Sequence, residues 1–219
     1  FDNAEPWWSS IDASHLHDIH SASTTFSDEV GADAQFGIDR TVAYFAAEHD
    51  RNSINGFGGP NVKDGVVTAG VHYGSGYNNA FWNGSAMVFG DGNGSSFGPL
   101  TSLDIAAHEM THGVTEFSAG LVYQGESGAL NESMSDVFAV LVEAWVRGEH
   151  PNMWKIGEDC YTPWNGTNDA LRYMDDPAAD GSSRDHYSTR YTGSADNGGV
   201  HWNSGIANLA FFLAAEGGQ

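Results

Sequence analysis

An α+β fold is predicted for this chain, because strand patterns fill its first half and helical patterns fill its second. Short alternating apolar runs between residues 66 and 97 are separated by glycine and asparagine clusters, which is typical of strands joined by turns. After residue 101, apolar residues recur every three or four positions, as on the buried face of a helix. We therefore expect a strand-rich part over residues 1–100, containing one helix, and a helical part over residues 101–219.

The strand-rich part begins with residues 1–32, which are polar, show no period and predict loop with short strands. A helix is predicted from Asp33 to Asp50, with an aspartate cap at its start. Gly37 is the one residue within it that disfavours a helix. The stretch NGFGGPNVKDG has turn composition, and the runs VVTAGVHY and SAMVFG that follow it predict strands.

The helical part begins with a predicted helix of about three turns within PLTSLDIAAHEMTHGVTE, capped by Thr101 or Ser102. A longer helix is predicted over LNESMSDVFAVLVEAWVRG, ending at Gly148. Residues 149–198 are rich in glycine, proline, asparagine and aspartate, which predicts long loops. A last helix is predicted from near Asn203 to the end of the chain.

The charge of the chain limits its partners. Among 219 residues, 29 are acidic and 8 are basic, for a formal net charge of −21. Such a surface repels nucleic acid and anionic membranes, so we expect neither as a partner. Bound divalent cations or a saline medium would each account for the acidity. Cys160 is the single cysteine, so no disulfide forms within the chain.

The sequence HEMTH suggests a metal site. His108 and His112 are four residues apart on a predicted helix, so both imidazoles can point to one place, with Glu109 beside them. This arrangement suits zinc, which needs a third protein ligand. Ser118 occupies the place of a third histidine found in one class of such sites, so a glutamate from the following helix is the other choice. Glu132 supplies it.

Acidic residues continue along the second helix. Glu132, Asp136 and Glu143 fall on one stripe, and carboxylates buried on an apolar helix cost several kcal/mol unless they are paired. Asp136 can hold the free ring nitrogen of a zinc-binding histidine. Asp104 lies one turn before His108, and antiparallel packing of the two helices would bring it to Glu143 in an all-oxygen site suited to calcium.

Two plainer interpretations compete with a metal site. The histidines could be ordinary buried side chains, and the acidic stripe could be a solvated helix face. The stripe is interleaved with apolar residues and nearly free of lysine, whereas a solvated face usually carries lysine. The number of acids in register with the two histidines favours the metal site.

With these residues in place, the chain resembles the thermolysin-like neutral metalloendopeptidases. The likeness runs from about Asp33 to Gln219, through GYNNAFWNGSAMVFGDG, HEMTH, GLVYQGESGALNESMSD, IGEDCYTP, LRYMDDP, DHYSTRYTG and DNGGVHWNSGI. It implies a zincin-type fold in which residues 101–219 bind zinc and the C-terminal helical domain is incomplete. The chain's own missing N- or C-terminal segment is then an expected partner.

The resemblance also implies the reaction. Zinc would be held by two histidines and a glutamate, and Glu109 would take a proton from zinc-bound water and pass it to the leaving amine. Two further groups would stabilise the oxyanion, one of them oriented by an aspartate. Position by position, the ligands are His108, His112 and Glu132, the oxyanion donors are His201 and Tyr123, and the orienting residue is Asp196.

Substrate contacts follow from the same likeness. Asn79, the backbone of Ala80 and the side chain of Arg172 would hold an extended peptide. An apolar pocket would accept the residue after the scissile bond, so cleavage is expected before bulky hydrophobic residues. The pocket would be formed by Phe97, Leu100, Ile105, Ile156, Cys160 and Leu171.

Calcium is expected at Asp104, Glu143 and Glu158. Relatives with a paired calcium site carry an acid where this chain has Lys155, and the resemblance therefore implies a single ion there. The sequence thus indicates a secreted, extracellular endopeptidase with one catalytic zinc and at least one structural calcium, acting on peptides or proteins. A zinc aminopeptidase and a non-catalytic metal-bound fragment are the alternatives.

Overall fold

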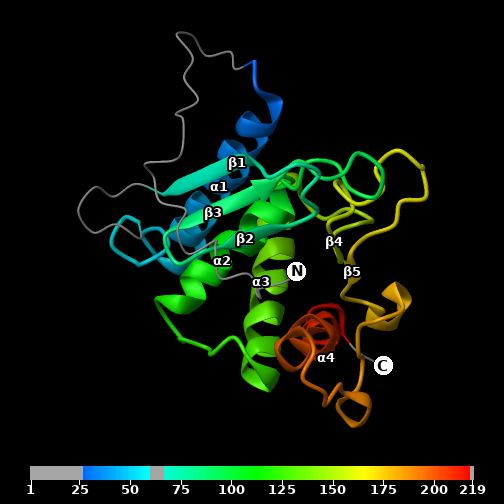
Figure 1. Ribbon diagram of the computed structural model, residues 1–219. Helices are drawn as coiled ribbons and strands as arrows, with labels where there is room; N and C mark the ends of the chain where they lie inside the picture. Colours follow the sequence, from blue (N-terminus) through cyan, green and yellow to red (C-terminus); the bar gives the residue numbers. More distant parts are fainter. Residues whose placement is uncertain (1–26, 60–66, 218–219) are drawn as a thin grey trace.

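The computed structural model describes residues 27–59 and 67–217 and has the α+β architecture that the sequence predicts (Figure 1). A three-stranded sheet lies across the first two helices, the third long helix packs against the second, and the fourth packs against the third. Residues 1–26 of the predicted irregular segment lie outside the described part. The principal elements in chain order are α1 Glu29–His49, β1 Thr68–Tyr73, β2 Ala80–Trp82, β3 Ala86–Gly90, α2 Leu103–Glu116, α3 Gly125–Arg147, β4 Lys155–Ile156, β5 Arg172–Tyr173 and α4 Asp196–Glu216.

The three-stranded sheet has the order β1-β3-β2, with β1 parallel and β2 antiparallel to β3. Both predicted strand runs are confirmed, and β2 is an additional short strand. It pairs from Ala80 to Trp82 and forms an edge of the described sheet. An edge strand has unpaired backbone groups on its outer side, which can bind an extended peptide.

Helix α1 begins at Glu29, four residues before the predicted start. The reason is the cap: Asp28 Oδ1 accepts a hydrogen bond from the Gly31 amide at 2.9 Å, which satisfies a free donor of the first turn. Gly37, which weakened the helix prediction, lies where α1 crosses α2. A Cβ atom there would be 2.5 Å from Cβ of Ala106, so glycine allows the two helices to approach.

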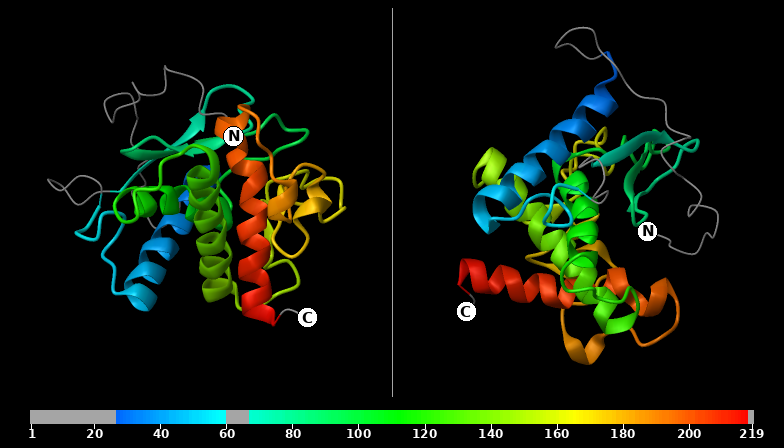
Figure 2. Two further views of the ribbon diagram at one scale, coloured as in Figure 1. Left: turned by 90° about the horizontal axis from the view of Figure 1, so that it is seen from below. Right: turned by 90° about the vertical axis from the view of Figure 1, so that its left-hand side faces the viewer.

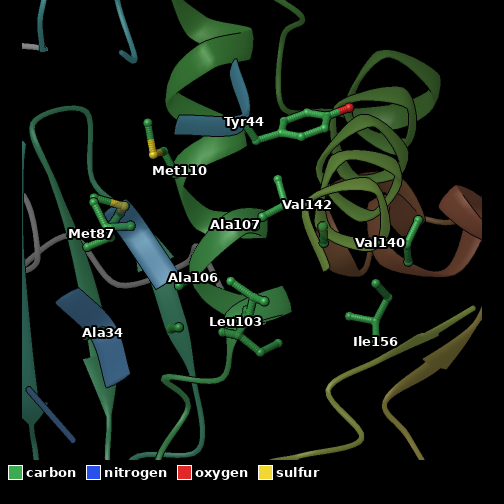
Figure 3. Packing of buried hydrophobic residues seen from close by; sticks show 14 of the residues in the cluster. Ala34, Tyr44, Met87, Leu103, Ala106, Ala107, Met110, Val140, Val142 and Ile156 are labelled. Atoms are coloured by element: carbon green, nitrogen blue, oxygen red, sulfur yellow. The ribbon is translucent and has the colours of Figure 1, made fainter. Parts of the chain in front are cut away.

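Helix α2 is the central helix of the molecule. Figure 3 shows Ala106, Ala107 and Met110 between Met87 of β3 on one side and Val142 of α3 on the other, and all five side chains are buried. Polar side chains on such a helix lose their hydration and need partners within the protein. The histidines and acids predicted on α2 therefore need hydrogen-bond or charge partners from neighbouring elements.

The start of α4 differs from the prediction. A first turn begins at Asp196, but Asn197, Gly198 and Gly199 adopt left-handed backbone angles, so the regular helix begins at Val200, three residues before the predicted start. The regular part of α4 packs beside α3 (Figure 2). Residues 149–198 form mostly turns, as predicted, with β4 and β5 paired antiparallel. No helix in the described residues is long and apolar enough to cross a membrane.

Candidate active site

A cavity of about 370 Å³ lies between β2, α2, α3 and the start of α4. It brings together residues that are up to 122 positions apart in the chain, from Asn79 to His201. Its wall includes eight residues that the sequence predicts to take part in catalysis, metal binding or substrate binding. They are Asn79, Ala80, His108, Glu109, His112, Tyr123, Glu132 and His201.

Three possible metal ligands meet at the floor of the cavity. His108, His112 and Glu132 each offer one ligand atom, and these atoms lie within 4.8 Å of one another. The two Nε2 atoms are 3.0 Å apart, and Glu132 oxygens lie 3.4 Å from His108 Nε2 and 3.3 Å from His112 Nε2. Two imidazoles and one carboxylate form the ligand set of catalytic zinc sites that keep a position open for water.

The other ring nitrogens show why these donors fit a cation. Nδ1 of His108 lies 2.8 Å from Asp136 Oδ1, and Nδ1 of His112 lies 2.8 Å from Asn131 Oδ1. Each Nδ1–H can donate a hydrogen bond to that oxygen, which leaves both Nε2 lone pairs facing one another beside a carboxylate. A metal ion bound between them would offset the repulsion among these lone pairs. Sequence reasoning missed Asn131, since no spacing rule distinguishes it from other polar residues of α3.

The predicted base, Glu109, is buried in the same cavity wall. Burial raises the pKa of Glu109 to about 7, although the nearby His108 opposes the shift. A carboxyl group with a pKa near 7 can both accept and release a proton at neutral pH. Burial alone would also raise the pKa of Glu132, but the histidines around it hold that pKa well below its ordinary value. The two glutamates are therefore electrostatically distinct.

Asp136 is the centre of a buried network behind the metal group. Its Oδ2 accepts hydrogen bonds from Arg172 Nε and from Asn208 Nδ2, both at 2.8 Å, and Arg172 Nη2 lies 2.6 Å from Oδ1. Burial raises the pKa of Asp136, yet Arg172 and His108 outweigh burial and lower it strongly. Arg172, expected to hold the substrate, is itself buried and does not line the cavity.

The opposite side of the cavity carries the predicted oxyanion donors. Asp196 Oδ1 lies 2.6 Å from His201 Nδ1, and its Oδ2 accepts the His201 amide at 2.8 Å. The left-handed turn at the start of α4 makes this double contact possible. The Tyr123 hydroxyl is 3.2 Å from His201 Nε2 and donates to Glu132 Oε1. His201, Tyr123 and the metal group thus face one space.

The residues predicted to form a hydrophobic pocket lie elsewhere. Four of them are almost fully buried and two are partly buried, and none lines the cavity. All six belong to or pack against the hydrophobic core, so the pocket stays a prediction. The four are Leu100, Ile105, Ile156 and Cys160, and the two are Phe97 and Leu171.

The predicted calcium ligands form a separate acidic cluster. Asp104 and Glu143 are buried, and burial together with Asp104 raises the pKa of Glu143 to about 8. Arg147 Nη1 is 2.6 Å from Glu143 Oε1, whereas Lys155 Nζ donates to the Asn168 carbonyl at 2.7 Å. Arg147 is therefore a positive charge in direct contact with the cluster, and the single calcium ion expected from Lys155 stays a prediction.

Comparison with known proteins settles the family. The profile described as "Thermolysin metallopeptidase, catalytic domain" matches residues 3–116, and "Thermolysin metallopeptidase, alpha-helical domain" matches residues 119–219. The chain belongs to the thermolysin metallopeptidase family. Thermolysin is itself a standard example of zinc bound by two histidines and one glutamate. The family's zinc chemistry agrees with the ligand set that the cavity presents.

Relatives within the family are similar over most of this chain. Bacillolysin of Brevibacillus brevis is 54% identical over 88% of the chain, and thermolysin of Alicyclobacillus acidocaldarius is 50% identical over 87%. The chain spans only about a third of these curated relatives, 34% and 33% respectively. The solved precursor of protealysin, a metalloproteinase from Serratia proteamaculans, has a TM-score of 0.77 and 38% identity, covering 90% of this chain and 62% of that one.

Proposed function

We propose that the protein is a zinc metalloendopeptidase. The observation that carries the proposal is the convergence of His108, His112 and Glu132 beside a buried Glu109 in one cavity. When bound, zinc acts as a Lewis acid and lowers the pKa of coordinated water to about 7. The edge strand β2 forms one wall of the same cavity, which favours an extended peptide as substrate.

The protein's own groups account for the remaining steps. Glu109 accepts a proton from the attacking water and returns it to the leaving amine, for which a pKa near 7 is suitable. His201 and Tyr123 donate hydrogen bonds to the oxyanion as the carbonyl becomes tetrahedral. Asp196 orients the ring of His201 by accepting a hydrogen bond from its Nδ1, and the doubly protonated imidazolium then donates from Nε2 to the oxyanion.

The finer parts of the proposal rest on the family resemblance. Asn79 and Ala80 line the cavity and can bind the peptide backbone. Cleavage before bulky hydrophobic residues requires an apolar pocket, which we propose is formed around Leu100 and Ile105, both buried side chains. We further propose that the enzyme is secreted and acts outside the cell.

Zinc titration tests the proposed activity. Metal-free protein, with calcium present, is titrated with zinc while cleavage of an internally quenched peptide with leucine after the scissile bond is followed. We expect internal cleavage to rise until one zinc is bound per chain. Zinc uptake at this stoichiometry without cleavage would make the chain a non-catalytic metal-bound fragment. Release of single N-terminal residues would indicate an aminopeptidase.

We also propose one structural calcium at Asp104, Glu143 and Glu158. Oε2 of Glu143 and Oε2 of Glu158 are buried and accept no hydrogen bond. Burial, Asp104 and Glu143 raise the pKa of Glu158 to about 9. Buried carboxylate oxygens without donors are suitable ligands for a hard cation such as calcium. Arg147 compensates only part of this negative charge.

Calcium is expected to change how stability depends on pH. Without calcium, Glu143 and Glu158 keep their protons up to pH values of about 8 and 9 in the folded state, but lose them near 4.5 when unfolded. The folded state then binds more protons, so stability must fall as pH rises through this interval. Calcium favours the ionised carboxylates and should remove much of the fall. Thermal unfolding from pH 5 to 8.5, with and without calcium, measures this dependence of stability on pH.

The variant Glu143→Gln provides the control for this prediction, because it removes one of the two titrating groups without changing the side-chain size. Its calcium-free profile should be flatter than that of the unmodified chain, and its response to calcium should be smaller. Identical pH profiles with and without calcium in the unmodified chain would contradict the proposed calcium site.

A further inference from the structure

One carboxylate in the cavity wall has no part in the mechanism above. Glu116 is the last residue of α2, is exposed, and lines the cavity together with Trp82 of β2. The indole Nε1 of Trp82 donates to Glu116 Oε2 at 2.8 Å. This bond holds the carboxylate against the edge strand and uses only one of its two oxygens.

The position of Glu116 along α2 places it relative to the reaction centre. It follows His112 by four residues, so it lies on the same helix face about 6 Å further along the axis. The metal group lies between His108 and His112, which makes its separation from Glu116 along the axis about 9 Å. An extended peptide advances about 3.3 Å per residue. For a peptide that lies along this face of α2, Glu116 is two to three residues from the scissile bond.

The helix also indicates on which side of the scissile bond Glu116 acts. Ile105, a member of the pocket proposed for the residue after that bond, precedes His108 on α2. Glu116 lies beyond His112 at the other end of the helix. A peptide that places its hydrophobic side chain toward Ile105 thus places its preceding residues toward Glu116.

The charge of the cavity wall favours a cation at this place. Of the three glutamates that line it, Glu132 belongs to the metal group and Glu109 to proton transfer, so Glu116 is the one left for substrate. Among the described residues, the lining includes no lysine or arginine. Trp82 adds an aromatic surface on which the aliphatic part and the charge of a long basic side chain can rest.

We propose that Glu116, held by Trp82, forms a subsite that selects lysine or arginine at the second residue before the scissile bond. The inference depends on the proposed endopeptidase function. An exposed ion pair contributes little energy, so the expected preference for lysine over uncharged norleucine at this position is about two- to fivefold in kcat/KM at low ionic strength. The preference should weaken at high salt, because exposed charges are screened.

The experiment compares three internally quenched peptides that differ only at this position, carrying lysine, norleucine or glutamate. They are tested on the zinc- and calcium-loaded chain and on Glu116→Gln. Glutamine can still accept the indole hydrogen bond, so this change removes the charge and keeps the contact. We expect the order lysine, norleucine, glutamate in the unmodified chain, and nearly equal values in Glu116→Gln.

The matched control is Glu48→Gln. Glu48 Oε1 accepts a hydrogen bond from Trp145 Nε1 at 3.0 Å, so it is the same kind of exposed pair, and it lies outside the cavity wall. This variant loses one negative charge from the protein and should keep the lysine preference. A preference lost equally in both variants would show a general effect of net charge and overturn the assignment to Glu116.

Peptide affinity separates this inference from the proposed activity. The three peptides are also bound to Glu109→Gln and to Glu109→Gln with Glu116→Gln, in which cleavage is suppressed. Tighter binding of the lysine peptide that disappears in the double variant supports the subsite even if nothing is cleaved. Cleavage of all three peptides with the same kcat/KM, or a preference that survives Glu116→Gln, overturns the subsite and leaves the endopeptidase proposal intact.

Discussion

Replacing Glu109 with glutamine is expected to slow peptide hydrolysis by about 10²–10⁴-fold while zinc remains bound. Glutamine has nearly the size of glutamate but cannot accept and return a proton. Glu109 is not one of the three grouped ligands, so the metal site should keep its affinity. Burial raises the pKa of Glu109 to about 7, so the residue serves near neutral pH as both base and acid. Glutamine removes both functions.

The measurement is kcat and kcat/KM on the quenched leucine peptide, together with zinc content by atomic absorption. Most of the loss should be in kcat, because proton transfer occurs in the chemical step and not in binding. Glu48→Gln, an exposed change outside the cavity, should retain full activity. Full activity in Glu109→Gln would show that another group is the base, and a parallel loss of zinc would show that Glu109 acts through the metal.

The local part of the site could be predicted because it depends on helix periodicity. The spacing of His108 and His112, and the position of Asp136 one turn after Glu132, needed only a period of 3.6 residues. The ring contact between His108 and Asp136 then follows from packing α2 against α3. Asn131 could not be predicted in the same way, because its contact with His112 depends on the exact rotation of α3.

The helix starts show where sequence patterns fail. The sequence pattern predicts the start of α1 at Asp33, but Asp28 provides the cap, and both aspartates look alike in the sequence. Helix α3 begins at Gly125, before the predicted segment, after Gln124, whose side chain makes no capping bond. Without a capping side chain there is no local signal for the first turn, so only tertiary packing determines it. Such starts are set by contacts distant in sequence.

Arg172 shows a contact that depends on residues far apart in the chain. The resemblance assigns its side chain to substrate; in the structure it forms two hydrogen bonds with Asp136 and is not among the residues that line the cavity. A guanidinium beside a carboxylate in two contacts is a strong, rigid pair. Its structural effect is to fix Asp136, and through Asp136 the ring of His108. The metal site thus depends on a residue that does not contact the metal.

Replacing Asp136 with asparagine is expected to destabilise the protein by about 3–5 kcal/mol, the cost of leaving a buried charge without its partner. Arg172 and Asp136 are both buried, and asparagine removes the negative charge that compensates the guanidinium. Asparagine also holds the His108 proton less strongly, and zinc affinity should fall by about 10–100-fold. Chemical denaturation of the metal-free and zinc-loaded protein, and competition with a chelator, measure the two effects.

The double variant Asp136→Asn with Arg172→Met separates the two causes. If an uncompensated guanidinium produces the loss of stability, removing it should recover part of that loss, and the two changes should be non-additive by about 0.5–3 kcal/mol. Zinc affinity should not recover, because His108 Nδ1 still lacks its carboxylate. Additive losses of stability would contradict the coupling, and restored zinc affinity would show that Arg172, rather than Asp136, controls the metal group.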